Sequence, residues 1–262
     1  MNILEELGAT AKERVAAAKK NRPLTALRYD AESLPTGNFA FEQAIRQAPD
    51  IAFICECKKA SPSKGVISPD FPYLDIARSY AAAGAECISV LTEPTRFLGQ
   101  DRYLQEIAAA VNVPCLRKDF TVDEYMVYEA KILGAAAVLL IVSLIRDRGR
   151  LKEYVDIADN IGLSALVETH DAAEIETALA AGARIIGVNN RNLHNFTVDT
   201  GNSLRLRQEV PTNVLFVAES GIVTAADVEA ARQAGADAVL VGESLMRAGD
   251  IGAKLAYLKN GG

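Results

Sequence analysis

The chain has 262 residues, of which 50% are hydrophobic and 24% charged, and its formal net charge is -6. Such an apolar content excludes a largely disordered chain, and the acidic balance argues against a nucleic-acid partner. The length fits either one large α/β barrel or two ordinary domains.

The chain carries no pattern typical of export or of membrane insertion. Residues 1–20 are amphipathic and charged, unlike an apolar signal segment or a transit peptide. The longest apolar run, 135–145, is too short to cross a bilayer. We expect buried free thiols in a reducing compartment, and hence a cytoplasmic protein, because the cysteines lie in strand-like runs without CxxC spacing. They are Cys55, Cys57, Cys87 and Cys115.

The first 50 residues predict a helical extension. Apolar residues recur at helical spacing over 3–19, and two shorter helices are expected at 24–33 and 40–48. Such an extension either covers the bottom or side of the main domain or shields a site from water, and we expect some of each. The predicted organisation is an extension over 1–50 and a catalytic barrel over 51–262, forming one domain overall.

The remainder of the chain contains an internal repeat in which a helix ends at a glycine and a buried strand follows. Four copies begin at residues 83, 133, 181 and 234. Their glycines are placed to end a helix in the left-handed conformation. Other strand-like runs lie between the copies, at 51–57, 113–118, 163–168 and 214–219. Interleaving gives eight strands that alternate with helices.

This alternation predicts a (β/α)8 TIM barrel, in the α/β class. An open doubly wound sheet is the alternative. It is disfavoured because no Gly-x-Gly-x-x-Gly follows the first strand, where a dinucleotide-binding sheet would carry it.

The stretch 51–65 takes a strand directly into charged residues. Side chains alternate faces along a strand, so Glu56 and Lys58 should point one way while Cys55 and Cys57 point the other. One face is therefore expected to react and the other to pack.

Polar residues also end five further predicted strands. They are Lys118, Glu168, the run 189–191, the run 219–221 and the run 242–244. Any one of them alone would fit a solvated loop charge or a structural ion pair. Together they predict an active site, because catalytic residues of barrels gather at the carboxyl ends of the strands. Crowding there should shift the pKa values of the two lysines, although the sequence leaves open which one titrates lower.

The loops after the seventh and eighth strands predict a phosphate site. Small residues at 220–222 and 242–244 let backbone N–H groups approach an anion, and a short helix expected near Ser244 would add its positive end. His170 and His194 lack ligand-like spacing, so no metal site is expected, and we place them at the surface or in helix caps. The runs 121–124 and 224–227 resemble helix caps.

Several motifs together resemble the indole-3-glycerol phosphate synthase family, the barrel enzymes of the tryptophan pathway. The motifs are Glu-Cys-Lys-Lys-Ala-Ser-Pro-Ser-Lys-Gly at 56–65, Leu-Thr-Glu-Pro-Thr-Arg-Phe-Leu-Gly at 91–99, Leu-Arg-Lys-Asp-Phe at 116–120, Leu-Val-Glu-Thr-His at 166–170, Ile-Gly-Val-Asn-Asn-Arg-Asn-Leu at 186–193, Ala-Glu-Ser-Gly-Ile at 218–222 and Val-Gly-Glu-Ser-Leu-Met at 241–246. The likeness spans essentially the whole chain.

The resemblance implies ring closure of 1-(2-carboxyphenylamino)-1-deoxyribulose 5-phosphate to indole-3-glycerol phosphate, with loss of carbon dioxide and water and without a cofactor. It implies that Lys118 is the general acid and Glu168 the base in dehydration. Lys58 would be a second acid or an orienting cation held by Glu56. The implied partner is this small phosphorylated substrate; association with other tryptophan-pathway enzymes stays open.

The resemblance also implies the residues that bind the substrate. Asn189, Arg191 and Glu219 would shape the pocket around the anthranilate part, which Phe97, Phe120 and Leu193 would wall. Ser61, Ser220, Gly221 and Gly242 would hold the phosphate. Some family members carry Ser or Thr in place of Glu243, whose acidic side chain we expect to point away from the phosphate.

Three rival interpretations stay open at the level of sequence. A sibling barrel, phosphoribosylanthranilate isomerase, has a similar phosphate end, but the resemblance implies a Cys and an Asp as its acid–base pair. This chain instead has Asn189 at the end of the sixth strand. A class I aldolase would use Lys118 to form a Schiff base. A non-catalytic phosphometabolite-binding barrel or pathway scaffold would bind without turnover.

Overall fold

The computed structural model describes residues 3–192 and 196–261, and within them eight parallel strands close into a barrel. Its strands are β1 (Ala52–Cys57), β4 (Cys87–Leu91), β5 (Cys115–Lys118), β6 (Ala137–Ile141), β7 (Ser164–Thr169), β8 (Ile185–Asn189), β9 (Leu215–Glu219) and β10 (Ala238–Val241). Each strand pairs with its neighbours in chain order, and β10 closes on β1. The predicted TIM barrel is confirmed.

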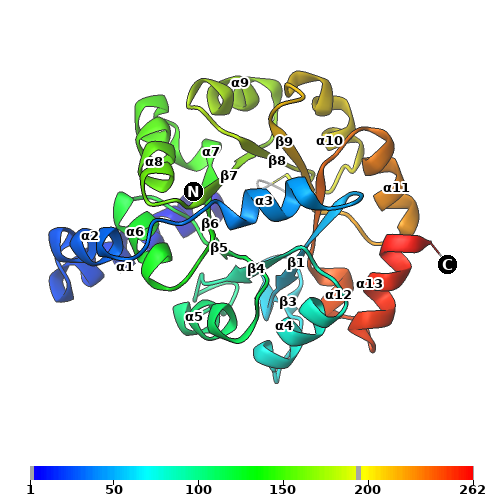
Figure 1. Cartoon of the computed structure of the whole chain (residues 1–262), viewed down its shortest axis with the longest axis horizontal. Helices are drawn as coiled ribbons and strands as arrows, with labels where there is room; N and C mark the ends of the chain where they lie inside the picture. Colours follow the sequence, from blue (N-terminus) through cyan, green and yellow to red (C-terminus); the bar gives the residue numbers. More distant parts are fainter. Residues whose placement is uncertain (1–2, 193–195, 262) are drawn as a thin grey trace.

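Helices separate the strands and form an outer ring around the barrel (Figure 1). The ring consists of α4 (Tyr73–Ala82), α5 (Asp101–Ala110), α6 (Glu124–Ile132), α8 (Arg148–Asn160), α9 (Ala172–Ala180), α10 (Gly201–Leu206), α11 (Ala225–Gln233) and α13 (Ile251–Asn260). Shorter pieces are α7 (Val142–Ile145), α12 (Glu243–Met246) and the 3-10 turn η1 (Arg207–Glu209). Among helices in the described part of the chain, none is both long and apolar enough to span a membrane.

The internal repeat has the predicted geometry. All four of its glycines have a positive φ, from 81° at Gly84 to 91° at Gly182, as the left-handed end of a helix requires. The strands that follow are fully buried, because one face packs in the barrel interior and the other against the helices. Along β1, Ile54 belongs to the interior cluster, whereas Cys55 and Cys57 pack in the outer layer.

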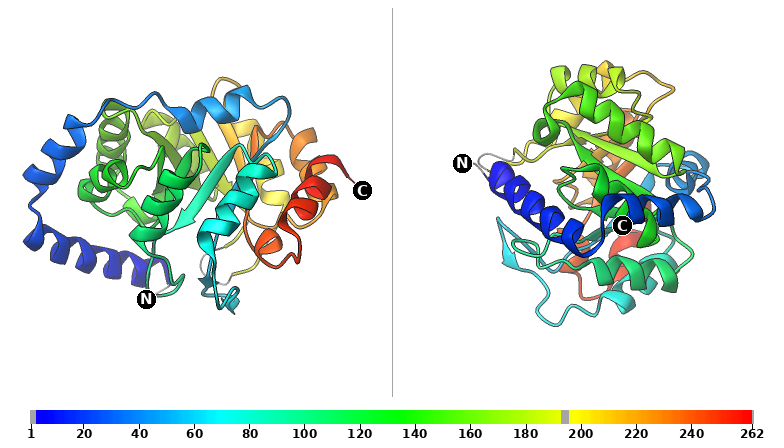
Figure 2. Two further views of the ribbon diagram at one scale, coloured as in Figure 1. Left: turned by 60° about the horizontal axis from the view of Figure 1, so that its bottom comes forward. Right: turned by 90° about the vertical axis from the view of Figure 1, so that its left-hand side faces the viewer.

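The extension before β1 covers both ends of the barrel. It forms α1 (Ile3–Asn21), α2 (Leu24–Ser33) and α3 (Ala40–Gln47), and α1 and α3 lie at opposite ends of the molecule (Figure 2, left). Phe41 of α3 is 0% exposed and packs among residues at the amino ends of the strands. Leu4 and Leu7 of α1 line a cavity at the carboxyl ends. The extension therefore covers the amino ends of the strands with α3 and lines the cavity with α1; that it shields the cavity from water stays a prediction.

Both runs that resemble helix caps do cap helices. Thr224 and Asp227 form a capping box on α11, and Asp123, within the run 121–124, caps α6 by accepting from the N–H of Tyr125. The loop after β1 also contains an antiparallel hairpin that the sequence pattern did not predict. It pairs β2 (Ala60–Ser61) with β3 (Gly65–Val66). Two-residue strands are too short to leave a periodic signal.

Candidate active site

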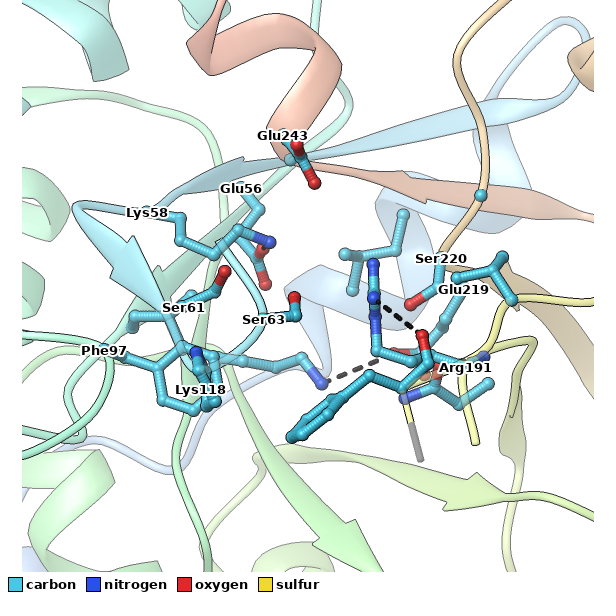
Figure 3. Close-up of a pocket in the computed structure, with 18 of the residues that line it drawn as sticks. Glu56, Lys58, Ser61, Ser63, Phe97, Lys118, Arg191, Glu219, Ser220 and Glu243 are labelled. Atoms are coloured by element: carbon cyan, nitrogen blue, oxygen red, sulfur yellow. Dashed lines mark hydrogen bonds and ion pairs between the residues drawn. The ribbon is translucent and has the colours of Figure 1, made fainter. Parts of the chain in front are cut away.

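A cavity of about 760 Å³ opens at the carboxyl ends of the barrel strands (Figure 3). Every predicted site residue that the structure describes lines this cavity. They are Glu56, Lys58, Ser61, Phe97, Lys118, Phe120, Glu168, Asn189, Arg191, Glu219, Ser220, Gly221 and Gly242. Leu193 and His194 lie outside the described residues. The barrel thus brings together side chains that are up to 186 positions apart, from Glu56 to Gly242.

Lys118 occupies the centre of the polar wall, at the end of β5. Its ammonium group lies 2.9 Å from Glu168 Oε2 and 3.3 Å from Glu219 Oε2. Both carboxylate side chains are 2% exposed, and that of Lys118 is 13% exposed. Figure 3 shows Lys118 extending into the cavity toward the Glu219 side. Because water is largely excluded, these charges interact more strongly than a surface pair would.

The three groups shift one another's protonation. Burial alone would lower the pKa of Lys118, but the charges of Glu168 and Glu219 raise it above its usual range. Burial also tends to raise the pKa of Glu168, yet Lys118 and His170 lower it below the ordinary value. Burial, opposed by Lys118 and reinforced by Glu168, raises the pKa of Glu219 to about 7. Two carboxyl groups that share one cation therefore have different proton affinities, an arrangement typical of acid–base sites.

A second ion pair lies on the neighbouring wall. Lys58 Nζ lies 2.6 Å from Glu56 Oε2, as expected for two side chains on one face of β1. Gly242 at the end of β10 makes room for this pair, because a Cβ there would lie 2.5 Å from Glu56 Oε2 and 3.1 Å from Lys58 Nζ. A side chain at the glycine that the sequence assigned to phosphate would therefore displace this charged pair.

Asn189 and Arg191 continue the polar wall after β8. The Asn189 side chain donates to Glu168 Oε1 at 3.1 Å and accepts from the backbone N–H of Arg191 at 3.0 Å. Glu168 therefore receives one donor on each carboxylate oxygen, from Lys118 and from Asn189. These contacts fix the orientation of its carboxylate.

The apolar wall is formed by two phenylalanines and by α1. The rings of Phe97 and Phe120 lie 6.0 Å apart at 40°. The loop that carries Phe97 is folded around the buried Glu93, whose Oε2 accepts from the backbone N–H groups of Arg96 and Phe97 at 2.7 and 3.0 Å. Together with Leu7, these rings form a surface that suits a planar aromatic group.

The opposite end of the cavity is built from small residues and chain turns. Ser220 and Gly221 both have positive φ, 64° and 85°, so the chain turns sharply after β9. A Cβ on Gly221 would lie 2.6 Å from Thr200 Cγ2, so only glycine fits there. Ser61, from the hairpin after β1, and α12 complete this end. The first N–H groups of a helix have no partner within it, which suits an oxyanion.

Glu243 does not point away from this end, contrary to our expectation. Its carboxylate lines the cavity and is 3.7 Å from Lys64 Nζ and 3.1 Å from Arg247 Nε. The acidic side chain is therefore balanced by two cations, which also line the cavity.

Sequence reasoning missed three groups that contact the site. His170, expected at the surface or in a cap, has a side chain that is only 19% exposed and lies beside Glu168. Gly187 leaves space for Glu219, because a Cβ there would lie 2.0 Å from Glu219 Oε1. Arg14 of α1 binds the buried Asp119, next to Lys118, with two hydrogen bonds of 2.6 and 3.1 Å. The sequence offered one signal for His170, namely its position two residues after Glu168. It offered none for Gly187 and Arg14, because their roles depend on tertiary contacts.

The donor set does not favour a metal. No cluster of three or more His, Cys, Asp or Glu side chains within residues 3–192 and 196–261 is arranged to hold a metal ion. Three of the carboxylates that line the cavity are instead paired with lysines: Glu56 with Lys58, and Glu168 and Glu219 with Lys118.

Comparison with known proteins points to one family. A family model described as "Indole-3-glycerol phosphate synthase" matches residues 4–258. A protein of that name from Ruminiclostridium cellulolyticum is 54% identical over 258 residues, covering 98% of each chain. Another, from Endomicrobium trichonymphae, is 49% identical and covers 98% of this chain and 100% of the relative.

Solved structures similar to this one support the fold alone. A crystal structure of 3-hexulose-6-phosphate synthase from Salmonella typhimurium has a TM-score of 0.65 at 14% identity, covering 79% of this chain and 96% of that one. At this identity the likeness extends to the barrel and not to the chemistry.

Proposed function

The chain belongs to the indole-3-glycerol phosphate synthase family, and we propose that the residues around Lys118 carry out the reaction of that family. The protein is a decarboxylating lyase of tryptophan biosynthesis that acts on a small phosphorylated substrate. The substrate, 1-(2-carboxyphenylamino)-1-deoxyribulose 5-phosphate, closes to indole-3-glycerol phosphate with loss of carbon dioxide and water. The proposed steps use side chains alone and need no cofactor.

Lys118 is the proposed general acid for ring closure. It protonates the ketose carbonyl oxygen while the carboxylate-bearing ring carbon attacks the carbonyl carbon, and loss of carbon dioxide then restores aromaticity. The contact with two buried carboxylates keeps the ammonium group charged before reaction. A pKa of Glu219 of about 7 supports this role, because protonation of Glu219 at neutral pH removes one of the two charges that hold the Lys118 proton.

Glu168 is the proposed base of the dehydration step. It is buried, yet the charge of Lys118 lowers its pKa, so the carboxylate is ionised and able to accept a proton. Lys58, held by Glu56 at 2.6 Å, supplies the second positive charge, as acid for the leaving hydroxyl group or as the cation that orients the substrate. An orienting cation must not bind the substrate carboxylate too strongly, since stabilising the ground state would oppose decarboxylation.

The two ends of the cavity orient the substrate for ring closure. Phe97 and Phe120 contact the aromatic ring, together with Leu193 by family resemblance, and Asn189, Arg191 and Glu219 surround the anthranilate part. Ser61, Ser220, Gly221 and Gly242 hold the phosphate. Anchoring both ends of a flexible ketose brings the reacting carbons together, which contributes several kcal/mol to catalysis.

The single observation that carries this proposal is the Lys118 ammonium group between two buried carboxylates in the cavity. The wild-type protein should convert the carboxyphenylamino ketose phosphate to a fluorescent indole product, which is visible because the chain contains no Trp. Borohydride added during turnover should leave no substrate carbon attached to the protein. Absence of product from folded protein would refute the proposed reaction, and trapping at Lys118 would replace acid catalysis by Schiff-base chemistry.

The cellular setting is a further part of the proposal. Cys55, Cys57, Cys87 and Cys115 are buried and free, which supports work in the reducing cytoplasm. Association with other enzymes of the tryptophan pathway is an additional hypothesis, which co-purification of the pathway enzymes would test.

A further inference from the structure

A second cavity, of about 720 Å³, adjoins the first and shares Leu4 and Asn189 with it. Its lining is mostly polar and includes His170, the histidine that follows β7. The proposed reaction assigns no role to this residue. It follows Glu168, which lines the first cavity, by two residues.

The imidazole of His170 lies between two carboxylates. Its Nδ1 lies 3.1 Å from Glu174 Oε2, which also accepts the backbone N–H of His170 at 2.8 Å. Its Nε2 lies 3.7 Å from Glu168 Oε1 and is buried without a hydrogen-bond partner. Asn202 donates to the carbonyl oxygen of His170 at 3.1 Å. The ring is therefore held on one side by Glu174 and faces the Glu168 carboxylate on the other, whereas Asn202 contacts only the backbone of His170.

We propose that His170 is a positioning residue for Glu168, acting as an imidazolium that Glu174 holds against the Glu168 carboxylate so that this base stays ionised. The inference deepens the proposed function, because it presumes that Glu168 is the base. A cation at this place offsets the burial of Glu168 while leaving Lys118 free to give its own proton to the substrate.

The other charges near His170 are consistent with a protonated ring. Burial would lower the pKa of His170, but the hydrogen bond to Glu174 and the charge of Glu168 raise it, with a smaller contribution from Glu219. Three more charged side chains line the second cavity: Arg146, Asp171 and Asp199. Arg146 pairs with Glu5 and Asp199 with Arg205, at 3.0 and 2.7 Å. Asp171 caps α9 by accepting from the N–H of Glu174. The protonation of His170 is therefore governed mainly by the two carboxylates beside it, those of Glu174 and Glu168.

Removing the charge should change the pH profile of catalysis. In His170→Asn the side chain stays polar but neutral, so the pKa of Glu168 rises and the acidic limb of kcat moves to higher pH by at least about one unit. KM should stay within about threefold of the wild-type value. His170→Lys restores a cation and should return the limb toward its wild-type position. Asn202→Ala, which removes a contact to the same loop without changing charge, is the matched control and should leave the limb in place.

Other outcomes overturn the proposal. A His170→Asn enzyme with lower kcat at every pH but an unmoved acidic limb, or a His170→Lys enzyme worse than His170→Asn, would assign a merely structural role. In either case wild-type turnover persists, so the proposed function survives. Absence of wild-type turnover would instead refute the proposed function itself.

If the His170 variants fail to fold, the proposal can still be tested by NMR on a chain that retains His170. The chain has two histidines, so the imidazole signals can be followed by NMR and assigned with His194→Gln. The pKa of His170 should lie above the ordinary value and should fall in Glu168→Gln. A pKa that is unchanged in Glu168→Gln would show that the two groups do not interact, and would overturn the proposal.

Discussion

At the scale of single residues, Glu219 is the most unusual group in the site. It is 1% exposed, its Oε1 is buried without a hydrogen-bond partner, and only the absence of a side chain at Gly187 gives that oxygen room. Burying a carboxylate in this way destabilises its charged form. The residue is retained, in our account, because its proton equilibrium tunes Lys118.

Replacing Glu219 by Gln should therefore stabilise the fold, and more so at higher pH. Because the pKa of Glu219 is raised to about 7 in the folded protein, this carboxyl group ionises at lower pH in the unfolded chain. The loss of folding stability caused by Glu219 therefore grows as the pH rises from about 4.5 to 7 and stays at its full size above pH 7. Relative to wild type, Glu219→Gln should gain up to about 2 kcal/mol more unfolding free energy at pH 8 than at pH 5. Urea unfolding at pH 5 and pH 8 measures this gain in unfolding free energy, with the exposed Glu176→Gln as control. Equal gains at the two pH values would count against a raised pKa of Glu219.

At the scale of elements, the sequence was most informative about strands and their ends. Predicted strands at 51–57 and 214–219 begin one residue before β1 and β9, because a buried parallel strand is a continuous apolar run. The same logic located Lys118 and Glu168. It failed for the hairpin β2–β3, whose strands have only two residues each.

The loop after β10 offers a test at this scale. A Cβ at Gly242 would overlap Glu56 Oε2 and crowd Lys58 Nζ, so Gly242→Ala should displace that ion pair and lower kcat by at least about tenfold. The displaced groups are ends of flexible side chains, so stability should fall by less than about 1 kcal/mol. Gly249→Ala, where a Cβ would meet nothing within 4 Å, is the matched control. Wild-type turnover in Gly242→Ala would mean that the position of the Glu56–Lys58 pair does not matter.

At the scale of the whole molecule, the site is completed by contacts that no local pattern encodes. Arg14 of α1 lies 105 positions from Asp119, yet its two hydrogen bonds join the extension to the residue after Lys118. Glu6 likewise pairs with Arg96 in the loop that carries Phe97. The helical periodicity of 3–19 predicted α1 but not the end of the barrel on which it lies, since periodicity identifies the buried face of a helix and not its partner.

The same reasoning explains why the contact of His170 with Glu168 was not predicted from the sequence. A lone histidine after a strand is usually a loop residue, and its burial here results from Glu174 on α9 and Asn202 on α10. The family resemblance supplied which strand-end residues to consider, and the barrel explains why they meet. The effects of Gly187 and Gly242 required the actual distances between neighbouring strands.

The central claim is that Lys118 provides acid catalysis, and turnover of Lys118→Ala tests it most directly. Indole product fluorescence from the carboxyphenylamino ketose phosphate should fall by at least about a hundredfold in kcat relative to wild type, the scale of general acid catalysis. Lys152→Ala, which removes an exposed lysine paired with Asp156 on α8, should keep wild-type activity. Circular dichroism would verify that both variants are folded. A folded Lys118→Ala enzyme within about tenfold of wild type would contradict the account.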